Sequence, residues 1–584
     1  MKKLMALLLA LALIPTAAFA EVKTASGTAD GYGGPINVTL SVEEGKLINV
    51  EVTGEKETIG IGTLAMDKMP QEMIDTNSVN VDVVTGATYT SEGVLKAAEA
   101  AVAALGVELV PVEKSTAAAA LEPVYTDVLV IGAGGAGRAA AAPAMDEGAE
   151  NVILVEMLSF TGGSTALSGG VMTRSAIEGD PEGTGGVMTR SAIEGDPEGT
   201  MGADEMHQYF MDISKNMADP EVVRAYVDHS GEDQPWAFSM GDGVQQTARY
   251  HVIPEHIMAI IPVGNATGAA TGIFLTQAME QGVRERGVDL RLETEAKELI
   301  VENGRVVGAK VKSKDGEYPI YAKGGVILAT GGFAQNKELV EQYGSPNADT
   351  VLVKCTAGAT GTGLVMARDI GAKVQFGDFW DTIGYHTLAA SGYRNRLNMV
   401  LINADGERFY REDGQLPFMY TEMCRQIADG KLKFFFLSDS NLEPEFANLE
   451  AKIPAVKLDT FEDLVAYTGC DAEILRKTLE DYNANKGKVD PQTGKDAEYM
   501  MGLEAPYYCV DTTVLRVATI GGLLTDKDAQ VLDSNDQPIP GLYAAGEVAN
   551  ASFYYDTYST CGSAVQHAVT FGRIAARNAV ANLK

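Results

Sequence analysis

One glycine-rich turn has the residue types and spacing of a nucleotide site. The apolar run Asp127–Ile131 predicts a buried strand, and Gly132, Gly134 and Gly137 follow it as G-x-G-x-x-G. The first glycine permits a tight turn, the second lets the backbone approach a pyrophosphate, and the third lets a helix pack on the strand. We expect Gly137 to open that helix, whose N-terminus favours anions. Glu156, after the next predicted strand, is placed to bind ribose hydroxyls. A turn with a purely structural role is the alternative.

Two later segments repeat the order of strand and glycine. Val326–Ala329 is followed by Thr330-Gly331-Gly332, and Gly541–Ala545 is followed by Gly546-Glu547. The predicted nucleotide domain is therefore discontinuous, with an insertion between roughly residues 376 and 512. The insertion contains a predicted helix from about Asp471, with Leu475, Leu479 and Tyr482 on one face.

Residues 21–106 are expected to form a small α+β unit. The alternation from Ile36 to Val52, with a turn at Glu44-Gly45, predicts a hairpin. Ser91–Leu105 is rich in alanine and amphipathic, and Gly106 occupies a helix-stop position. The string D-V-V-T-G-A-T, residues 82–88, precedes this helix. In the simplest interpretation, Thr85 or Thr88 only caps the helix.

Composition limits the compartment and the partners. Lys2 and Lys3, the apolar run to Ile14 and the Ala18-Phe19-Ala20 site predict a secretion signal over residues 1–20, with no lipoprotein cysteine beside it. We expect a secreted, periplasmic or cell-surface protein without a membrane span. The formal charge of −34 disfavours nucleic acid as a partner. Five cysteines without C-x-x-C pairs argue against haem and iron–sulfur sites, and six scattered histidines predict no metal site.

The chain resembles the fumarate reductase/urocanate reductase flavoprotein family, in the form with an N-terminal FMN-binding domain. The resemblance covers essentially the whole mature chain and rests on DVVTGATYTS, VLVIGAGGAGRAAA, TGGSTALSGG, VILATGGF, INADGERFYRE and PIPGLYAAGEV…FGRIA. It implies FAD rather than NAD in the nucleotide site. It also implies FMN joined through its phosphate to Thr88 by an extracytoplasmic flavin transferase. Besides the first turn and Glu156, the implied FAD contacts are Gly162, Gly163, Ser164, Thr330, Gly331, Gly332, Gly546 and Glu547.

The implied fold class is α/β. A Rossmann-like FAD-binding domain carries an inserted α+β substrate-capping domain and follows a small α+β FMN-binding domain. The predicted boundaries are 1–20 for the signal peptide, 21–106 for the FMN-binding domain, 107–124 for a linker, 125–375 and 513–584 for the FAD-binding domain, and 376–512 for the capping domain.

Three positions that handle carboxylates in the fumarate-type enzymes differ in this chain. The place of the proton-donating arginine is Leu416, that of the carboxylate-clamping arginine is Ser559, and that of a histidine is Ala518. Leu, Ser and Ala cannot replace the charged fork of an arginine. We therefore expect that fumarate is not the substrate.

Aromatic and phenolic side chains are the candidates to replace them. Tyr558 and Tyr555 lie in the C-terminal segment that the resemblance places at the flavin, and ketosteroid dehydrogenases of this fold keep a tyrosine at the place of Tyr558. A phenol can donate a hydrogen bond to an enone oxygen or transfer a proton. His386 and Tyr420 are further catalytic candidates, and Arg394, Arg396 and Arg411 are candidates for a displaced cation. Each aromatic residue has the alternative of an ordinary place in the core.

The leading hypothesis is an exported FMN/FAD reductase. It would transfer hydride from FAD N5 to a C=C bond conjugated to a carbonyl or carboxylate (urocanate, cinnamate or an enone), as a terminal reductase in anaerobic respiration. Its partners would be a small electron-acceptor substrate and an extracytoplasmic electron donor. The alternatives are a ketosteroid-type flavin dehydrogenase and an electron carrier with a decayed active site.

One exact repeat stands apart from these motifs. Residues 169–184 recur unchanged as residues 185–200. Two copies are too few for a structural repeat array, which needs about three or more units. We interpret the repeat as a recent duplication or a sequence artefact, and expect the surplus copy to loop out.

Overall fold

The computed structural model describes residues 22–57, 62–84, 87–112, 121–174, 203–242, 244–246, 259–264, 272–344, 346–376, 382–386, 388, 396–414, 416–555, 557–560 and 562–584. The second copy of the repeat, the predicted signal peptide, Thr85 and Arg394 lie outside these residues. The chain divides into two compact units, with the boundary between Ala117 and Ala118. We describe each unit by itself.

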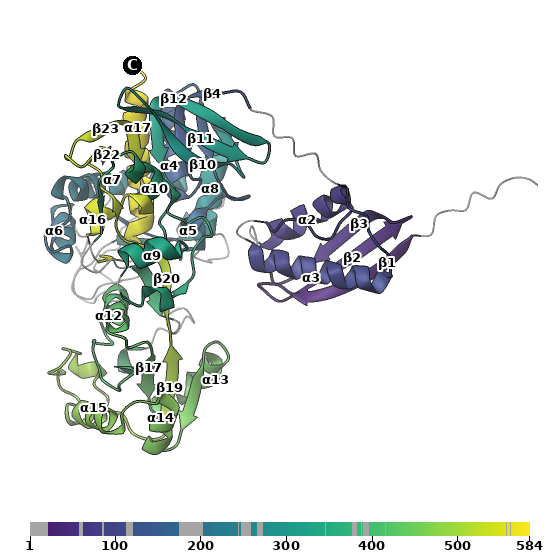
Figure 1. Cartoon of the computed structure of the whole chain (residues 1–584). Helices are drawn as coiled ribbons and strands as arrows, with labels where there is room; N and C mark the ends of the chain where they lie inside the picture. The colour runs from purple at the N-terminus through teal and green to yellow at the C-terminus, as the bar shows by residue number, and fades with distance from the viewer. Residues whose placement is uncertain are drawn as a thin grey trace, which may run out of the picture. The chain divides into compact units, whose positions relative to one another are not determined.

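The first unit is an antiparallel sheet with two helices packed on it (Figure 1). Its strands are β1 (Lys23–Asp30), β2 (Pro35–Glu43) and β3 (Lys46–Thr53), and its helices are α2 (Gly62–Thr76) and α3 (Thr88–Leu105). Alternate residues of β2 are buried, from Ile36 to Val42, and they pack against both helices. The predicted hairpin is confirmed, since β2 and β3 pair across Glu44-Gly45.

Helix α3 begins earlier than its hydrophobic pattern suggested. It starts at Thr88 rather than Ser91 and ends at Leu105, with Gly106 as a left-handed C-cap. Ala87 is the N-cap and makes no side-chain cap hydrogen bond. Thr88 is thus the first residue of the helix, not its cap.

The second unit is built on an eight-stranded sheet whose central strands are parallel. Strands β4 (Val124–Ile131), β5 (Val152–Val155), β12 (Gly316–Leu328) and β23 (Pro538–Ala544) form this centre, with β9 (Asp289–Arg291) beyond β5. The other three strands pair antiparallel with their neighbours. Strand β10 (Glu295–Glu302) pairs with β11 (Arg305–Ser313), β11 pairs with β12, and β22 (Gln530–Leu532) pairs with β23. Helices α4 (Gly135–Asp146) and α17 (Ser563–Ala581) pack together beside the sheet, and α8 (Gly272–Glu285) contacts α4 (Figure 1).

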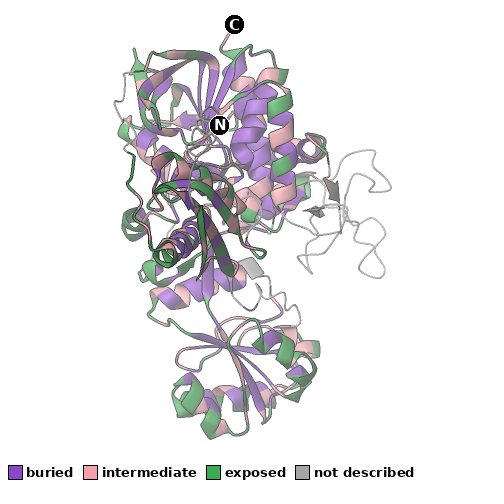
Figure 2. Ribbon diagram, turned by 90° about the vertical axis from the view of Figure 1, so that its right-hand side faces the viewer, coloured by how far each residue is buried: buried purple, intermediate pink, exposed green. Residues whose placement is uncertain are grey.

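A separate four-stranded sheet lies within the predicted insertion. Its order is β16 (Val400–Asn403), β17 (Phe434–Ser438), β19 (Tyr507–Thr512) and β18 (Ala455–Leu458). Helices α13 (Glu443–Glu450), α14 (Phe461–Thr468) and α15 (Ala472–Ala484) accompany it. The predicted face of α15 is confirmed, because Leu475, Leu479 and Tyr482 are buried and Asp471 is the N-cap. Figure 2 shows burial concentrated in the strands of both sheets and in α17.

The remaining described elements include the strands of three smaller sheets. These elements are α5 (Gly163–Leu167), β6 (Val171–Arg174), α6 (Ala203–Ile213), α7 (Pro220–Phe238), β7 (Gln245–Gln246), β8 (Ala259–Gly264), α9 (Lys337–Tyr343), η2 (Ala348–Thr350), β13 (Leu352–Val353), α10 (Thr362–Asp369), β14 (Val374–Gln375), β15 (Thr382–His386), η3 (Arg396–Asn398), α12 (Leu416–Ala428), η4 (Ser440–Leu442), η5 (Ala497–Tyr499), β20 (Val514–Thr519), β21 (Gly522–Leu523), η6 (Gly546–Val548) and α16 (Ala551–Tyr554). The three smaller sheets have the strand orders β13-β20-β15, β14-β21 and β6-β8-β7. Among the helices that the structure describes, none combines the length and apolar character of a membrane span.

Asn77 fastens three parts of the first unit and provides a test of its packing. Its Oδ1 accepts the Leu47 N–H at 2.7 Å, and its Nδ2 donates to the carbonyls of Gly45 and Val110, both at 3.0 Å. We expect Asn77→Ala to lower the free energy of opening of this unit by about 2–3 kcal/mol, because three hydrogen bonds are lost. Hydrogen exchange of the full chain, followed by mass spectrometry, measures this. The exposed Asn49→Ala is the control, and equal protection in both variants would contradict the assignment.

Candidate active site

The carboxyl ends of the parallel strands bring the predicted glycine turns together. Gly132 follows β4 with φ +103°, and a Cβ there would lie 2.4 Å from the Ala329 carbonyl oxygen at the end of β12. A Cβ on Gly137 would lie 1.7 Å from the Gly132 carbonyl oxygen, so helix, turn and neighbouring strand touch through their backbones. Helix α4 begins at Gly135, and Gly137 lies within its first turn. The expectation that Gly137 opens the helix was therefore wrong by two residues, because the chain turns helical as soon as Gly134 has made the N-cap.

A second glycine turn lies against the first. Gly134 and Gly162 form a parallel bridge, and the Gly162 N–H donates to the Ala133 carbonyl at 3.0 Å. Gly163 has φ +53°, and a Cβ there would lie 3.3 Å from the Gly134 Cα. A Cβ on Gly134 would meet no atom nearer than 4.0 Å, so open space adjoins this residue, which is the N-cap of α4. Ser164 follows in α5. Two glycine turns joined by their backbones at the start of α4 fit a pyrophosphate.

Glu156 lies directly under the first turn. Its Oε2 accepts the Ala133 N–H at 2.8 Å and its Oε1 accepts the Leu158 N–H at 3.0 Å. Burial raises the pKa of the Glu156 carboxyl, and the hydrogen bonds from Leu158 and Ala133 oppose this. The carboxylate therefore organises the turn, and its contact with a ribose remains a prediction.

The third group of predicted contacts meets around Glu547. Its Oε1 accepts the backbone N–H of Thr519 at 2.7 Å and the hydroxyl of Thr519 at 3.0 Å. A Cβ on Gly332 would lie 2.0 Å from this oxygen, which places the turn after β12 against η6. The Thr330 hydroxyl is buried and has no hydrogen-bond partner among the residues that the structure describes. The turns containing Gly331 and Gly546 thus lie at the carboxyl edge of the parallel strands.

These residues fit the FAD that the resemblance implies. The glycine pairs suit the pyrophosphate, and Glu156 holds the first of these turns. The Thr330 hydroxyl, which has no partner among the described residues, offers a polar contact beside Gly331. FAD supplies hydride transfer between N5 and a substrate carbon when it is bound.

The four predicted catalytic residues divide into two groups. Tyr558 lies close to the N-terminus of α17, where its hydroxyl accepts the Gly562 N–H at 3.0 Å, and Tyr555 is the C-cap of α16. Tyr555 has φ +63°, a strained conformation for a tyrosine. The ring of Tyr554 lies 5.5 Å from that of Tyr558 at a tilted angle, and the Tyr554 hydroxyl donates to Ser563 at 2.8 Å. The structure therefore places a cluster of phenols at this helix end.

His386 and Tyr420 belong to the other group. His386 is fully buried in β15, and its ring lies 5.0 Å from that of Phe436 in β17. Burial, and then the charge of Arg396, lower the pKa of the imidazole to about 3, so the ring is neutral near pH 7. Tyr420 is buried in α12 within the same core as Phe436. Both residues thus pack in the core of the insertion, and their catalytic roles remain predictions.

The replaced positions have neighbours that the sequence did not reveal. Ser559 and Ala518 are buried, and α12 begins at Leu416. Arg516 precedes Ala518 by two residues on β20, and the pairing of β20 with β15 is irregular between these two positions. The Arg516 side chain is only 2% exposed and donates to the Ala348 carbonyl. Burial lowers the pKa of the Arg516 guanidinium, and Tyr420 is the neighbour that raises this pKa most. This buried cation was not among the predicted site residues, and strand alternation could not have indicated it because of the irregularity at Val517.

The arginines proposed as displaced cations already have partners in the structure. Arg396 donates to the Gly414 carbonyl at 2.6 Å. Arg411 pairs with Asp413 at 2.6 Å and with Asp496 at 3.3 Å. Both therefore support the backbone around residues 411–414.

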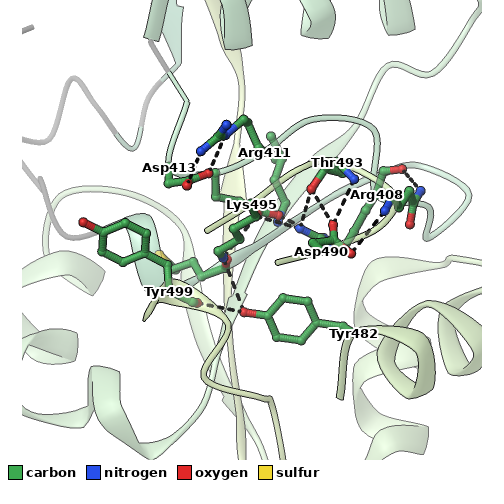
Figure 3. Close-up of polar contacts among 12 residues, drawn as sticks. Arg408, Arg411, Asp413, Tyr482, Asp490, Thr493, Lys495 and Tyr499 are labelled. Carbon is green, nitrogen blue, oxygen red and sulfur yellow. Dashed lines mark hydrogen bonds and ion pairs between the residues drawn. The ribbon is translucent and has the colours of Figure 1, made fainter. Parts of the chain in front are cut away.

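A buried ion-pair network holds the segment before α12 (Figure 3). Glu412 pairs with Arg408 at 2.9 Å and with Lys495 at 3.1 Å, and Arg408 also pairs with Asp490 at 2.7 Å. Burial alone would raise the pKa of the Glu412 carboxyl, but Lys495 and Arg408 outweigh it and lower the pKa. Lys495 also donates to the Met399 carbonyl at 2.7 Å. The charges balance within the network, which ties the loop after α15 to β16.

The comparisons with known proteins agree with this geometry. The FAD binding domain family matches residues 127–565, and the FMN-binding domain family matches residues 31–103. The chain belongs to the flavoprotein family of the fumarate and urocanate reductases. The urocanate reductase of Eggerthella lenta is 30% identical over 590 residues, covering 95% of this chain and 92% of that protein. A probable fumarate reductase of Shewanella frigidimarina is 29% identical, covering 80% and 76%.

A solved structure supports the fold directly. The open conformation of a flavocytochrome c3 fumarate reductase matches with a TM-score of 0.60 at 28% identity, covering 79% of each chain. The predicted fold class and family are confirmed. The chain is a flavin-dependent oxidoreductase of the class that acts on CH–CH groups, with FAD and FMN as its cofactors.

The contact between helix α4 and its turn predicts a loss of FAD on substitution. Gly137→Ala places a methyl group 1.7 Å from the Gly132 carbonyl oxygen, which must displace the turn. We expect FAD to bind at least about tenfold more weakly, a loss of about 1.4 kcal/mol or more. Flavin absorbance per chain after gel filtration, and FAD titration, measure this. Gly169→Ala is the control, since its Cβ would meet nothing nearer than 4.0 Å. FAD content equal to that of the wild type would contradict the geometry.

The buried carboxyl of Glu547 predicts a pH dependence of stability. Burial raises its pKa from 4.5 to about 7, and the hydrogen bonds from Thr519 and Gly332 oppose this. Because the folded pKa lies above the unfolded value, the stabilising contribution is complete below pH 4.5 and is lost as the pH rises through about 7. We therefore expect the FAD-free protein to lose thermal stability relative to Glu547→Gln between about pH 5 and about pH 8. If the Tm of the wild type and the Tm of Glu547→Gln changed equally with pH across this range, Glu547 would not titrate as inferred.

Proposed function

We propose that this chain is an exported reductase that carries FMN on Thr88 and saturates a C=C bond conjugated to a carbonyl or a single carboxylate. In this proposal, electrons from an extracytoplasmic donor enter at the FMN and leave through the FAD to the substrate. The N-terminal lysines, apolar run and A-x-A site support export. The D-x-x-T-G-A-T motif supports attachment by a flavin transferase at Thr88, the first residue of α3.

The observation that carries the proposal is the phenol cluster at the N-terminus of α17. Tyr558 reaches the backbone of Gly562, and Tyr554 reaches Ser563. A phenol can hydrogen-bond the carbonyl that activates a C=C bond, and it can return a proton to the α-carbon. Reduction of such a bond requires a hydride at the β-carbon and a proton at the α-carbon, and this cluster offers the proton donor.

The charges around the site favour a substrate with at most one carboxylate. The two places of the family's arginines hold Leu416 and Ser559, which cannot balance a carboxylate. Arg516 is a buried cation on the strand that carries Ala518. One cation with several aromatic residues suits a larger monocarboxylate or an enone better than a small dicarboxylate. Terminal reduction in anaerobic respiration is the corresponding role.

A dehydrogenase of the ketosteroid type is the second candidate. It would use the same Tyr558 to hold a ketone while the flavin removes hydride. The observation in its favour is the Tyr558 hydroxyl at the α17 N-terminus. The FMN-binding domain, which would feed electrons inward, favours reduction.

An anaerobic acceptor panel tests the proposal. The flavinylated chain receives electrons from a reduced viologen dye, and fumarate, urocanate, cinnamate and a steroid enone are offered in turn. We expect dye oxidation with an aromatic enoate or an enone, and little with fumarate. Tyr558→Phe should lower kcat on the order of 100-fold, the usual contribution of a general acid. Tyr125→Phe, at a residue 73% exposed, is the matched control.

Three results would contradict this account. Rapid turnover of fumarate would show that another cation replaces the missing arginines. Faster oxidation of a saturated ketone than reduction of its enone would favour the dehydrogenase. Unchanged kcat in Tyr558→Phe would remove this phenol from the chemistry.

A further inference from the structure

A stripe of polar side chains runs along one face of α17. Ser563, Gln566, Thr570 and Arg573 recur at a spacing of three or four residues, which places them on one side of the helix. The first three are fully buried, and Arg573 is largely buried. The Gln566 side chain donates to the Thr570 hydroxyl at 3.0 Å. This is an unusual face for the interior of a helix pair, because such interfaces are normally apolar.

Helix α7 presents a matching stripe. Tyr226, Ser230, Asp233 and Gln234 are buried on α7, which packs against α17. Asp233 forms an ion pair with Arg573, and the Thr570 hydroxyl lies near enough to lower the pKa of the Asp233 carboxyl. We call these eight residues of α7 and α17 the polar seam.

The inner end of the polar seam reaches the proposed active site. The Ser563 hydroxyl accepts from Tyr554 at 2.8 Å and donates to the Thr560 carbonyl at 2.7 Å. The Tyr226 hydroxyl donates to the Thr173 carbonyl at 2.8 Å. Tyr558 lies close enough to both Tyr226 and Tyr554 to raise their pKa further, after burial as the main cause. Three phenols therefore meet where the seam ends at the start of α17.

The outer end reaches the surface. Arg573 is 14% exposed and lies over the ring of Trp236, with its guanidinium carbon 4.6 Å from the ring centroid. His229, one turn before Asp233 on α7, is half-buried. The seam thus connects a solvent-facing ion pair with the buried phenols.

Several polar atoms inside the polar seam make no hydrogen bond to the residues that the structure describes. They are both polar atoms of the Gln234 amide, the Gln566 Oε1 and the Asp233 Oδ2. An unsatisfied buried polar group costs roughly 1–3 kcal/mol, so buried polar groups normally bond to protein or to ordered water. Polar sites of this kind are where buried water is found. An interface that served packing alone would have used apolar side chains here.

We propose that the polar seam is a water-containing proton route from the surface at Arg573 and Asp233 to the phenols at the N-terminus of α17. The proposal rests on the proposed function. When the substrate takes a hydride at its β-carbon, a phenol O–H bond breaks and a C–H bond forms at the α-carbon. The phenolate then regains its proton from bulk water through the seam. The route takes over the delivery that the family assigns to the arginine at the place of Leu416.

The charges around Asp233 suit the outer end of such a route. Burial raises the pKa of its carboxyl, while Arg573, the Thr570 hydroxyl, His229 and Arg577 lower it less. A carboxyl poised in this way can take up a proton from solvent and release it inward. Ser563, Gln566 and Thr570 offer side-chain groups that both donate and accept.

The test compares variants that remove and restore one hydroxyl of the seam. Thr570→Val removes it, Thr570→Ser keeps it, and Thr468→Val is the matched control at a buried threonine of α14. Pre-reduced holoenzyme is mixed anaerobically with urocanate or cinnamate, and separately with ferricyanide, which takes electrons without protonating carbon. We expect Thr570→Val to slow oxidation by the enoate on the order of tenfold or more and to enlarge its solvent isotope effect, with ferricyanide unaffected. Thr570→Ser should restore the rate.

A crystal structure of the holoenzyme supplies a second readout that is independent of turnover. We expect ordered waters bonded to Gln234, Gln566 and Asp233, and a dry interface would overturn the route. Equal slowing of Thr570→Val with the enoate and with ferricyanide would also overturn the route, because the hydroxyl would then serve only packing. No slowing of Thr570→Val would overturn it as well, because the hydroxyl would then have no part in proton transfer. If the wild type reacts with ferricyanide but with no enoate or enone, the proposed function fails, and the presence or absence of the waters alone decides the route.

Discussion

Contact between backbones at the carboxyl edge of one parallel sheet is the constraint on which the second unit depends. Gly132 lies against the end of β12 and Gly137 lies against Gly132, each at a distance that excludes a side chain, and Gly163 lies close to Gly134. These contacts place the N-terminus of α4 beside the turn before α5 and open a space at Gly134. The turn after β12 and the residues of η6 join the same edge, because β12 pairs with both β4 and β23. A dinucleotide site therefore follows from how closely these strands and helices approach.

The chemistry of the site depends on which charges are buried and which are paired. Glu156 and Glu547 are held by backbone N–H groups, and Glu412 is held by Arg408 and Lys495. Around the start of α17, by contrast, the groups are phenols and hydroxyls. A site of this kind supplies hydrogen bonds and protons more readily than counter-charges. That difference connects the missing arginines, the buried Arg516 and the polar seam. In the proposed function, aromatic side chains hold most of the substrate. In the proposed route, its proton arrives between α7 and α17.

Much of this was predictable where local sequence dictates local structure. The strands before the glycine turns, the hairpin after Ile36 and the buried face of α15 were confirmed, because each depends on periodicity or on residues that only a turn tolerates. The start of α4 at Gly135 and of α3 at Thr88 was missed by two or three residues, since the caps, Gly134 and Ala87, carry no side-chain signal. Arg516, the network around Glu412 and the polar seam were not predicted. They join residues far apart in sequence, such as Asp233 and Arg573, and their pairing arises only when the helices pack.

The account's central claim is that one chain works with two flavins, one of them covalently attached. Acid precipitation of the purified, flavinylated chain tests this most directly, with the flavin in the supernatant and in the pellet identified by mass. The account predicts about one FAD released per chain and one FMN retained on the peptide that contains Thr88. Release of all flavin by acid would contradict covalent attachment, and a chain with neither flavin would contradict the claim as a whole.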